Sequence, residues 1–448
     1  MALVFRTRRS AEGKIDPTGP PTHSAALRIR EPNLPFADPL ERRPMFSAAL
    51  HLFRPILVLL ALALSLAAVP AAGQTERDLP GEPVVLALDG EFGLTNSTSA
   101  ESIQRGILTA IDDINRNGGV LGGRPLTLIT REHRSISARG IKNIRELATI
   151  PGLVAVFGGR FSPVVIEELP VLEQTRTLFL APWSSADDIV DNGMEPNYIF
   201  RLSLRDSLAM PFLLKRATDR GLTHVGLLLT NTAWGRSNLE AANSYLAGHK
   251  TPDLVGTAWY NWRDRSLIDK YQALADAGAQ AILLVANDDE AAVLVREVAA
   301  LPPQRRLPIL SHWGVTGGDF VGQAGPALQE VDFSVIQTVS PFRIPKDRLA
   351  PVLETAGRLF GIHRPEDIVS PVGFLHAYDL TRILALAIDR AGTTDRAAVR
   401  NALEQVGPYH GVTRDYDRPF APGRHEALGP DDLLMARFRA DGVLVPVD

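Results

Sequence analysis

The chain has 448 residues, 45% hydrophobic and 22% charged, which is enough for two globular domains with sizeable cores. A formal net charge of −4 provides no basic field for nucleic acid or an anionic membrane. The sequence contains no cysteine, which excludes disulfides, thiolate catalysis, Cys-ligated zinc and a lipid-modified cysteine.

The strongest apolar run is Ile56–Ala68, followed by small residues up to Gly73. This pattern predicts a signal peptide over 45–73, since a membrane span needs about 20 apolar residues. An uncleaved N-terminal anchor is the alternative. The Arg- and Pro-rich segment 1–44 is interpreted as a disordered extension or a mis-called start, with Met45 as the initiator. The mature protein is therefore expected in the periplasm, without a lipid anchor.

From Val84 onward, apolar strands alternate with amphipathic helices. The predicted strands are Val84–Leu88, Leu126–Thr130, Val154–Phe157, Leu178–Ala181, Val225–Leu229, Val255–Tyr260, Ala281–Val285 and Pro308–Ser311. The predicted helices are Ser102–Arg116, Ser137–Leu147, Pro163–Gln174, Ser237–Ala247, Ser266–Ala277, Asp289–Ala300, Arg348–Phe360 and Pro371–Ala391. This alternation predicts an α/β fold with doubly wound parallel sheets and helices on both faces.

Two such series follow one another, one over 84–205 and one over 206–340. Tyr198–Asp206 between them is predicted to be a crossing strand. After the two last predicted helices comes a Pro/Gly/Asp-rich region that reaches the C-terminus.

Polar and aromatic residues follow several of the predicted strands, where open α/β sheets bind small ligands. Ser162 suits a helix N-cap and Pro163 the first helical position, so free N–H groups there can bind a carboxylate. Trp183, Ser184 and Ser185 follow the next strand, where hydroxyls can bind a polar group and the indole can stack. The alternatives are a plain helix cap and a polar turn.

The second series carries comparable loops. Trp234, beside Gly235, is predicted to lie in an exposed turn and to contact a ligand, although packing is the alternative. Asn287 precedes the acidic residues 288–290, which are more simply explained by the dipole of the helix they begin. Asn287 is therefore the better candidate for ligand contact.

Several ordered segments together resemble one family: Gln104–Asn115, Gly118–Gly122, Val156–Gly159 with Ser162, Leu180–Ser185, Tyr198–Arg201 and Ala233–Gly235. On these residues the chain resembles type I periplasmic solute-binding proteins of the branched-chain amino acid class, which serve ABC transporters. The resemblance implies two lobes joined by a three-strand hinge that closes on a ligand. It implies lobe 1 at 84–205 with 341–428, and lobe 2 at 206–340 with 429–448. It also implies that the protein performs no chemistry and delivers its ligand to an inner-membrane permease. The protein is expected to be a monomer.

The same resemblance assigns roles to residues. It implies that Ser162 binds the ligand carboxylate, that Trp183 and Ser185 contact the ligand's polar head, and that Trp234 closes over it. Ser99 matches a position that can approach the ligand.

Trp313 departs from the family pattern, which has an acidic residue here for the ligand's ammonium. Burying the ligand's ammonium without an acidic partner costs roughly several kcal/mol. Asp206, Asp288 or Asp289 would have to supply the compensating negative charge. We therefore hypothesise an amino acid or an aromatic organic acid as ligand.

No enzyme or metal signature is found in the sequence. The Gly118–Gly123 cluster follows a helix and precedes a strand, the reverse of a phosphate loop. There is no G-x-S-x-G or H-E-x-x-H motif, and the histidines are scattered. The sequence thus predicts a substrate-binding protein of an ABC uptake transporter, without cofactor, metal or nucleic-acid partner. A receptor that feeds a membrane signalling kinase is the alternative.

Overall fold

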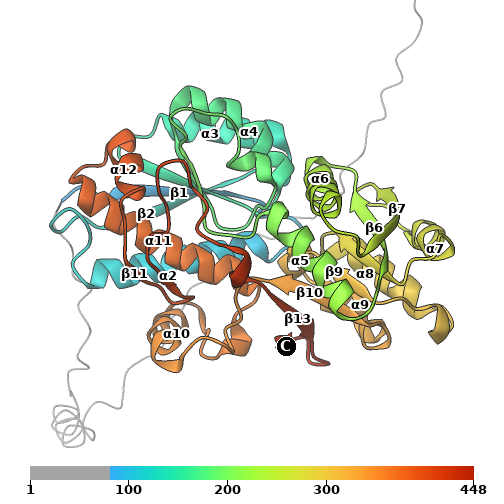
Figure 1. Cartoon of the computed structure of the whole chain (residues 1–448). Coiled ribbons are helices and arrows are strands. Elements are labelled where there is room, and N and C mark those ends of the chain that lie inside the picture. Colours follow the sequence, from blue (N-terminus) through green and yellow to red (C-terminus); the bar gives the residue numbers. More distant parts are fainter. Residues whose placement is uncertain (1–80, 448) are drawn as a thin grey trace, which may run out of the picture. The chain divides into compact units, whose positions relative to one another are not determined.

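The computed structural model of the chain describes residues 81–447 (Figure 1). The predicted extension over 1–44 and the signal peptide over 45–73 lie outside the described residues. From 81 to 447, no helix combines the length and the apolar character that crossing a bilayer requires.

The first sheet has the order β2-β1-β3-β4-β5 and is parallel throughout. All residues of β3 and β4 are buried, as expected for parallel strands that are covered on both faces. The strands are β1 (Val84–Gly90), β2 (Leu126–Glu132), β3 (Leu153–Gly158), β4 (Leu178–Ala181) and β5 (Ile199–Arg201).

Helices cover both faces of this sheet (Figure 1). Ala87 of β1 packs in the cluster under α3 and α4, whereas its neighbours Leu86 and Leu88 pack in the cluster of α2 and α11. The bounds are α2 (Ser99–Arg116), α3 (Ser137–Ala148), α4 (Ser162–Thr175), α10 (Lys346–Phe360), α11 (Pro371–Ala391) and α12 (Arg396–Leu403). We call this sheet with these helices lobe 1.

The second sheet has the order β14-β13-β10-β9-β8-β6-β7. Its first five strands along the chain are parallel. β13 pairs antiparallel with β10, and β14 pairs antiparallel with β13 at the edge of the sheet. The strands are β6 (His224–Thr230), β7 (Asp253–Tyr260), β8 (Ala281–Val285), β9 (Ile309–Ser311), β10 (Phe333–Gln337), β13 (Leu434–Phe438) and β14 (Leu444–Val447).

This sheet and its helices form lobe 2. The helices are α5 (Asp206–Asp219), α6 (Ala233–Ala247), α7 (Ile268–Asp276), α8 (Asp288–Ala299) and α9 (Phe320–Ala324). A small ribbon of β11 (Tyr409–His410) and β12 (Asp415–Tyr416) lies outside both sheets. The two mainly parallel sheets confirm the predicted fold class.

Three segments of the described chain connect the lobes, at 201–206, 337–346 and 416–434. Two of them lie side by side, because the Arg201 N–H donates to His425 O at 2.8 Å and Ala427 N–H donates to Arg201 O at 2.9 Å. The buried Arg201 guanidinium also pairs with Glu426. The first and third connections are thus held together by main-chain bonds and an ion pair.

Some elements differ from the sequence prediction. Tyr198–Asp206 is not one strand, because β5 ends at Arg201 and Asp206 begins α5. The helix α5 was not predicted, since Pro211 interrupts its pattern. The C-terminal strands were missed too, because they are short and β14 carries Pro446, which is tolerated on a sheet edge.

Candidate functional site

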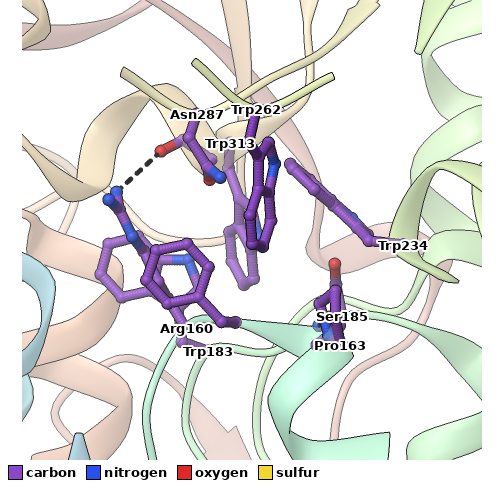
Figure 2. Close-up of a pocket in the computed structure, with 11 residues that line it drawn as sticks. Arg160, Pro163, Trp183, Ser185, Trp234, Trp262, Asn287 and Trp313 are labelled. Carbon is purple, nitrogen blue, oxygen red and sulfur yellow. Dashed lines mark hydrogen bonds between the residues drawn. The ribbon is translucent and has the colours of Figure 1, made fainter. Parts of the chain in front are cut away.

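A small cavity forms where loops from both lobes meet, at the carboxyl ends of their parallel strands (Figure 2). Lobe 1 contributes Arg160–Pro163 after β3, and Trp183 and Ser185 after β4. Lobe 2 contributes Trp234 after β6, Trp262 after β7, Asn287 after β8, and Trp313 and Gly314 after β9.

Six of the residues singled out in the sequence line this cavity, and three do not. Those that line it are Ser162, Trp183, Ser185, Trp234, Asn287 and Trp313. Ser99, Ser184 and Asp206 are buried and are not among the lining residues. Ser99 donates its hydroxyl hydrogen to Glu91, and the hydroxyl of Ser184 has no hydrogen-bond partner in the described chain.

Ser162 is not the N-cap that the sequence suggested. Phe161 occupies the N-cap, so Ser162 is the first residue of α4 and Pro163 the second. The Ser162 hydroxyl oxygen instead accepts the N–H of Ser185 at 3.1 Å and that of Ala186 at 3.2 Å. Ser162 therefore ties the loop after β3 to the loop after β4.

The buried guanidinium of Arg201 also donates hydrogen bonds to the loop after β4. Its Nη1 donates to Ala186 O at 2.7 Å and to Ser184 O at 3.3 Å. Since Arg201 is in the first connection between the lobes and pairs with Glu426 of the third, the Trp183–Ala186 loop is anchored directly to these two connections.

Trp234 is held by a buried hydrogen-bond network in lobe 2. It lies in the first turn of α6, which begins at Ala233, and not in an exposed loop as predicted. Its Nε1 donates to Asp206 Oδ1 at 3.3 Å, and His312 Nε2 lies 3.1 Å from the same oxygen. Because His312 Nδ1 accepts the N–H of Trp313, the ring hydrogen is on Nε2 and is donated to Asp206.

Arg160 was missed in the sequence. Its side chain is only 5% exposed, and Nη1 reaches across to lobe 2, where it lies 2.8 Å from Asp288 Oδ1. Nη1 also donates to Gly314 O at 3.3 Å (Figure 2). The guanidinium carbon lies 4.8 Å from the centre of the Phe161 ring, while Nε is buried without a partner among the described residues. A charged residue between a buried strand and a buried helix was the signal that could have found it.

Trp262 was missed as well, although it follows a predicted strand after only one residue, Asn261. Its ring packs edge-on against Phe161 with centroids 5.4 Å apart. Its indole Nε1 is buried and has no hydrogen-bond partner within 81–447. It therefore has a donor available inside the cavity.

Among the described residues that line the cavity, Arg160 is the only charged one. The three acids considered for a ligand ammonium each interact with another side chain. Asp206 accepts hydrogen bonds from Trp234 and His312. Asp288 forms an ion pair with Arg160, and Asp289 accepts a hydrogen bond from Gln323 Nε2 at 2.8 Å. The wall of the cavity is thus cationic and aromatic.

Asp89 and Glu91 at the carboxyl end of β1 and Glu168 in α4 are buried acids. Glu91 accepts the backbone N–H of Arg160 at 3.3 Å, and Asp89 accepts Asn143 Nδ2 at 2.8 Å. Burial raises the pKa of Asp89 to about 7 and raises that of Glu168 well above its usual range. No group of His, Asp and Glu within 81–447 is arranged to hold a metal ion.

The family model for periplasmic binding protein matches residues 84–431, which is most of the chain. This chain belongs to the periplasmic binding protein family. Since the family is one of binding proteins, the expectation that the chain is not an enzyme is confirmed.

Similar proteins support this assignment. "Leu/Ile/Val-binding protein homolog 1" from Brucella abortus (strain 2308) is 22% identical over 337 residues, which cover 73% of this chain and 85% of that protein. A periplasmic binding protein type 1 from Bordetella pertussis Tohama I superimposes with a TM-score of 0.72 at 18% identity, covering 82% of this chain and all of that one. A solute-binding protein from R. palustris, solved with 4-hydroxybenzoate, gives a TM-score of 0.65 at 14% identity, covering 82% and 96%.

Proposed function

We propose that this periplasmic binding protein is the substrate-binding component of an ABC uptake transporter. Its ligand is a small carboxylate-bearing molecule, an amino acid or an aromatic acid, bound between the lobes and delivered to an inner-membrane permease. The observation that supports this is the convergence of strand-end loops from both lobes on one cavity lined by hydroxyl, guanidinium and indole groups. We further propose the lobe boundaries implied by the sequence, 84–205 with 341–428 and 206–340 with 429–448.

The contacts between the lobes describe a closed arrangement. Thr98 N–H donates to Gly317 O and Asp319 N–H to Asn96 O, both at 2.9 Å. On the same side, the Ser370 hydroxyl donates to Thr316 O at 2.6 Å. These bonds and the Arg160–Asp288 pair form only when the lobes are together.

The volume of the cavity explains why the lobes must separate. It measures about 10 Å³ in this arrangement, which is room for about one water molecule. An amino acid or benzoic acid enters only after the contacts between the lobes break. Binding and reclosure are then a single equilibrium, because both sets of loops touch the ligand only in the closed form.

The ligands of similar proteins support the proposed class of ligand. One is named for leucine, isoleucine and valine, and another was solved with 4-hydroxybenzoate. Both ligand types have a carboxylate and an apolar body, and the cavity offers donors for the first and indole rings for the second.

A thermal-shift screen of the purified protein against amino acids and organic acids tests the proposal. A ligand that binds only the native state raises the melting temperature by an amount that grows with its concentration. Titration calorimetry then measures affinity and stoichiometry, with one site per chain expected. If no carboxylate of either class shifts the melting temperature, the proposed function is wrong.

A further inference from the structure

We infer that the ligand is a carboxylate that lacks an α-ammonium group, and that Arg160 is the residue that recognises its anionic end. This inference rests on the proposed function and narrows it to one ligand class. It follows from which polar groups of the cavity already have partners and which do not.

Two buried donors of the cavity wall lack hydrogen-bond partners among the described residues. Arg160 Nε and Trp262 Nε1 are both buried, both belong to residues that line the cavity, and neither has a hydrogen-bond partner among the described residues. A guanidinium and an indole can donate but cannot accept hydrogen bonds. A group that satisfies them must be an acceptor, and an ionised carboxylate has only acceptors.

Arg160 is arranged to bind such an anion. Its Nη1 forms an ion pair with Asp288 and donates a hydrogen bond to Gly314 O, which fixes the guanidinium in place, and its flat face lies over the Phe161 ring. The Nε edge of the fork remains for a ligand. Guanidinium groups bind carboxylates through such edges with two parallel hydrogen bonds.

No lining residue can neutralise an ammonium. Asp206 does not line the cavity. Its Oδ1 accepts from Trp234 and His312, and its Oδ2 is buried without a hydrogen-bond partner among the described residues. Asp288 lies 2.8 Å from Arg160 Nη1, so an ammonium placed on it would lie beside the guanidinium, where like charges repel. The site therefore discriminates against the zwitterion of an amino acid.

The remaining walls select an apolar body. Trp183 of lobe 1 and Trp313 of lobe 2 have ring centroids 5.9 Å apart at an interplanar angle of 53°, and Trp234 and Trp262 complete the lining from lobe 2 (Figure 2). Aromatic faces and edges suit a flat ring. Aryl carboxylates such as benzoates and phenylpropanoates fit both the charge and the lining.

The first test uses pairs of ligands that differ in one group. Calorimetry compares 3-phenylpropanoate with phenylalanine and 4-methylpentanoate with leucine, pairs that differ only in the α-ammonium. It also compares 3-phenylpropanoate with 3-phenylpropanamide, which lacks the charge. We expect the acid without an ammonium to bind at least about 30-fold more tightly than its amino acid and than its amide.

An amino acid that binds as tightly as its partner, or more tightly, overturns the inference but leaves the proposed function standing. If neither amino acids nor other carboxylates bind, both the inference and the proposed function are wrong.

The second test changes Arg160 and its partner. Arg160→Gln should weaken 3-phenylpropanoate at least about 30-fold, while Arg160→Lys retains the charge and should lose less. Asp288→Asn removes the carboxylate that helps to fix the guanidinium but retains an acceptor oxygen, so it should weaken binding of the acid less than Arg160→Gln does. Arg364→Gln, at an exposed arginine paired with Asp367, is the matched control and should have no effect.

Circular dichroism and melting curves check that each variant is folded. If Arg160→Gln does not fold, the affinity of Arg160→Lys and the comparison of the ligand pairs test the inference instead. Selective loss of amino acid binding in Asp288→Asn would make Asp288 the ammonium partner and overturn the inference, as would full affinity in Arg160→Gln.

Discussion

The imidazole Nε2 of His312 donates to Oδ1 of Asp206 at 3.1 Å, and both side chains are completely buried. Asp206 is the first residue of α5, directly after the first connection between the lobes. The same oxygen accepts the indole N–H of Trp234. An acid that the sequence suggested for a ligand ammonium thus holds in place one of the rings that line the cavity.

Replacing Asp206 with alanine should therefore damage both the fold and the site. Two buried donors, on Trp234 and His312, lose their acceptor, and each such loss costs about 1–3 kcal/mol. We expect the free energy of unfolding in urea to fall by about 2–5 kcal/mol and ligand affinity to fall with it. Asp206→Asn retains the acceptor oxygen and should lose less. Equal losses in the two variants would show that the hydrogen bonds are not the cause.

Ser162 and Ser184 provide a matched pair of serine-to-alanine changes. Ser162→Ala leaves the N–H groups of Ser185 and Ala186 without their acceptor, which should cost about 1–3 kcal/mol for each group and loosen the loop after β4. The Ser184 hydroxyl has no partner in the described chain, so Ser184→Ala should leave stability unchanged or raise it. Urea unfolding of both variants checks the prediction, which is wrong if Ser184→Ala is the more destabilised.

The parallel sheets could be predicted because buried strands and amphipathic helices have clear periodic patterns. The prediction of α11 matches the structure at both ends, since Pro371 begins the helix and Gly392 follows it. The antiparallel strands β13 and β14 could not be predicted in the same way. They are short and partly exposed, and β13 pairs with β10 almost a hundred residues away in the sequence, a relation that no local pattern carries.

The sequence predicted several of the site residues that follow the carboxyl ends of the strands. Residues directly after β4, β6, β8 and β9 were found for that reason, whereas the ion pair of Arg160 with Asp288 joins residues 128 positions apart. Asp206 was considered as a partner for a ligand ammonium for a similar reason. Its actual partners are Trp234 of a helix and His312 of another loop, which are distant in the sequence. Sequence order gives which loops meet but not which side chains pair.

Gly314 allows Trp234 to approach the loop after β9. A Cβ on Gly314 would lie 2.6 Å from Trp234 Cη2 and 2.5 Å from Ala286 O, both far inside van der Waals contact. Gly314→Ala should displace the indole and weaken ligand binding by at least about tenfold, since overpacking a buried site costs about 1–3 kcal/mol. Gly248→Ala is the control, because its nearest neighbour would be 3.8 Å away. Normal affinity in Gly314→Ala would contradict this account of the cavity wall.

Two buried groups should give the stability a dependence on pH with opposite signs. Burial raises the pKa of Asp89 to about 7, so the folded protein retains a proton that the unfolded chain releases near pH 4. Its contribution is complete below about pH 4 and is lost as the pH rises to 7. Burial lowers the pKa of His376 to about 3, so the contribution of that group is present above about pH 6.5 and is lost on acidification.

The variant Asp89→Asn separates the two effects, because an amide preserves the shape of the side chain and does not titrate. The free energy of unfolding of the wild type, taken relative to Asp89→Asn, should fall between pH 5 and pH 7 with a slope of up to about 1.4 kcal/mol per pH unit. Urea unfolding in a buffer series measures it, with the exposed Asp276→Asn as a control that should follow the wild type. A difference that is constant over this range would mean that Asp89 is already ionised at pH 5. In that case the charged carboxylate would need a compensating cation at the end of β1, and Arg131, whose positive charge favours the ionised form of Asp89, would be the residue to replace next.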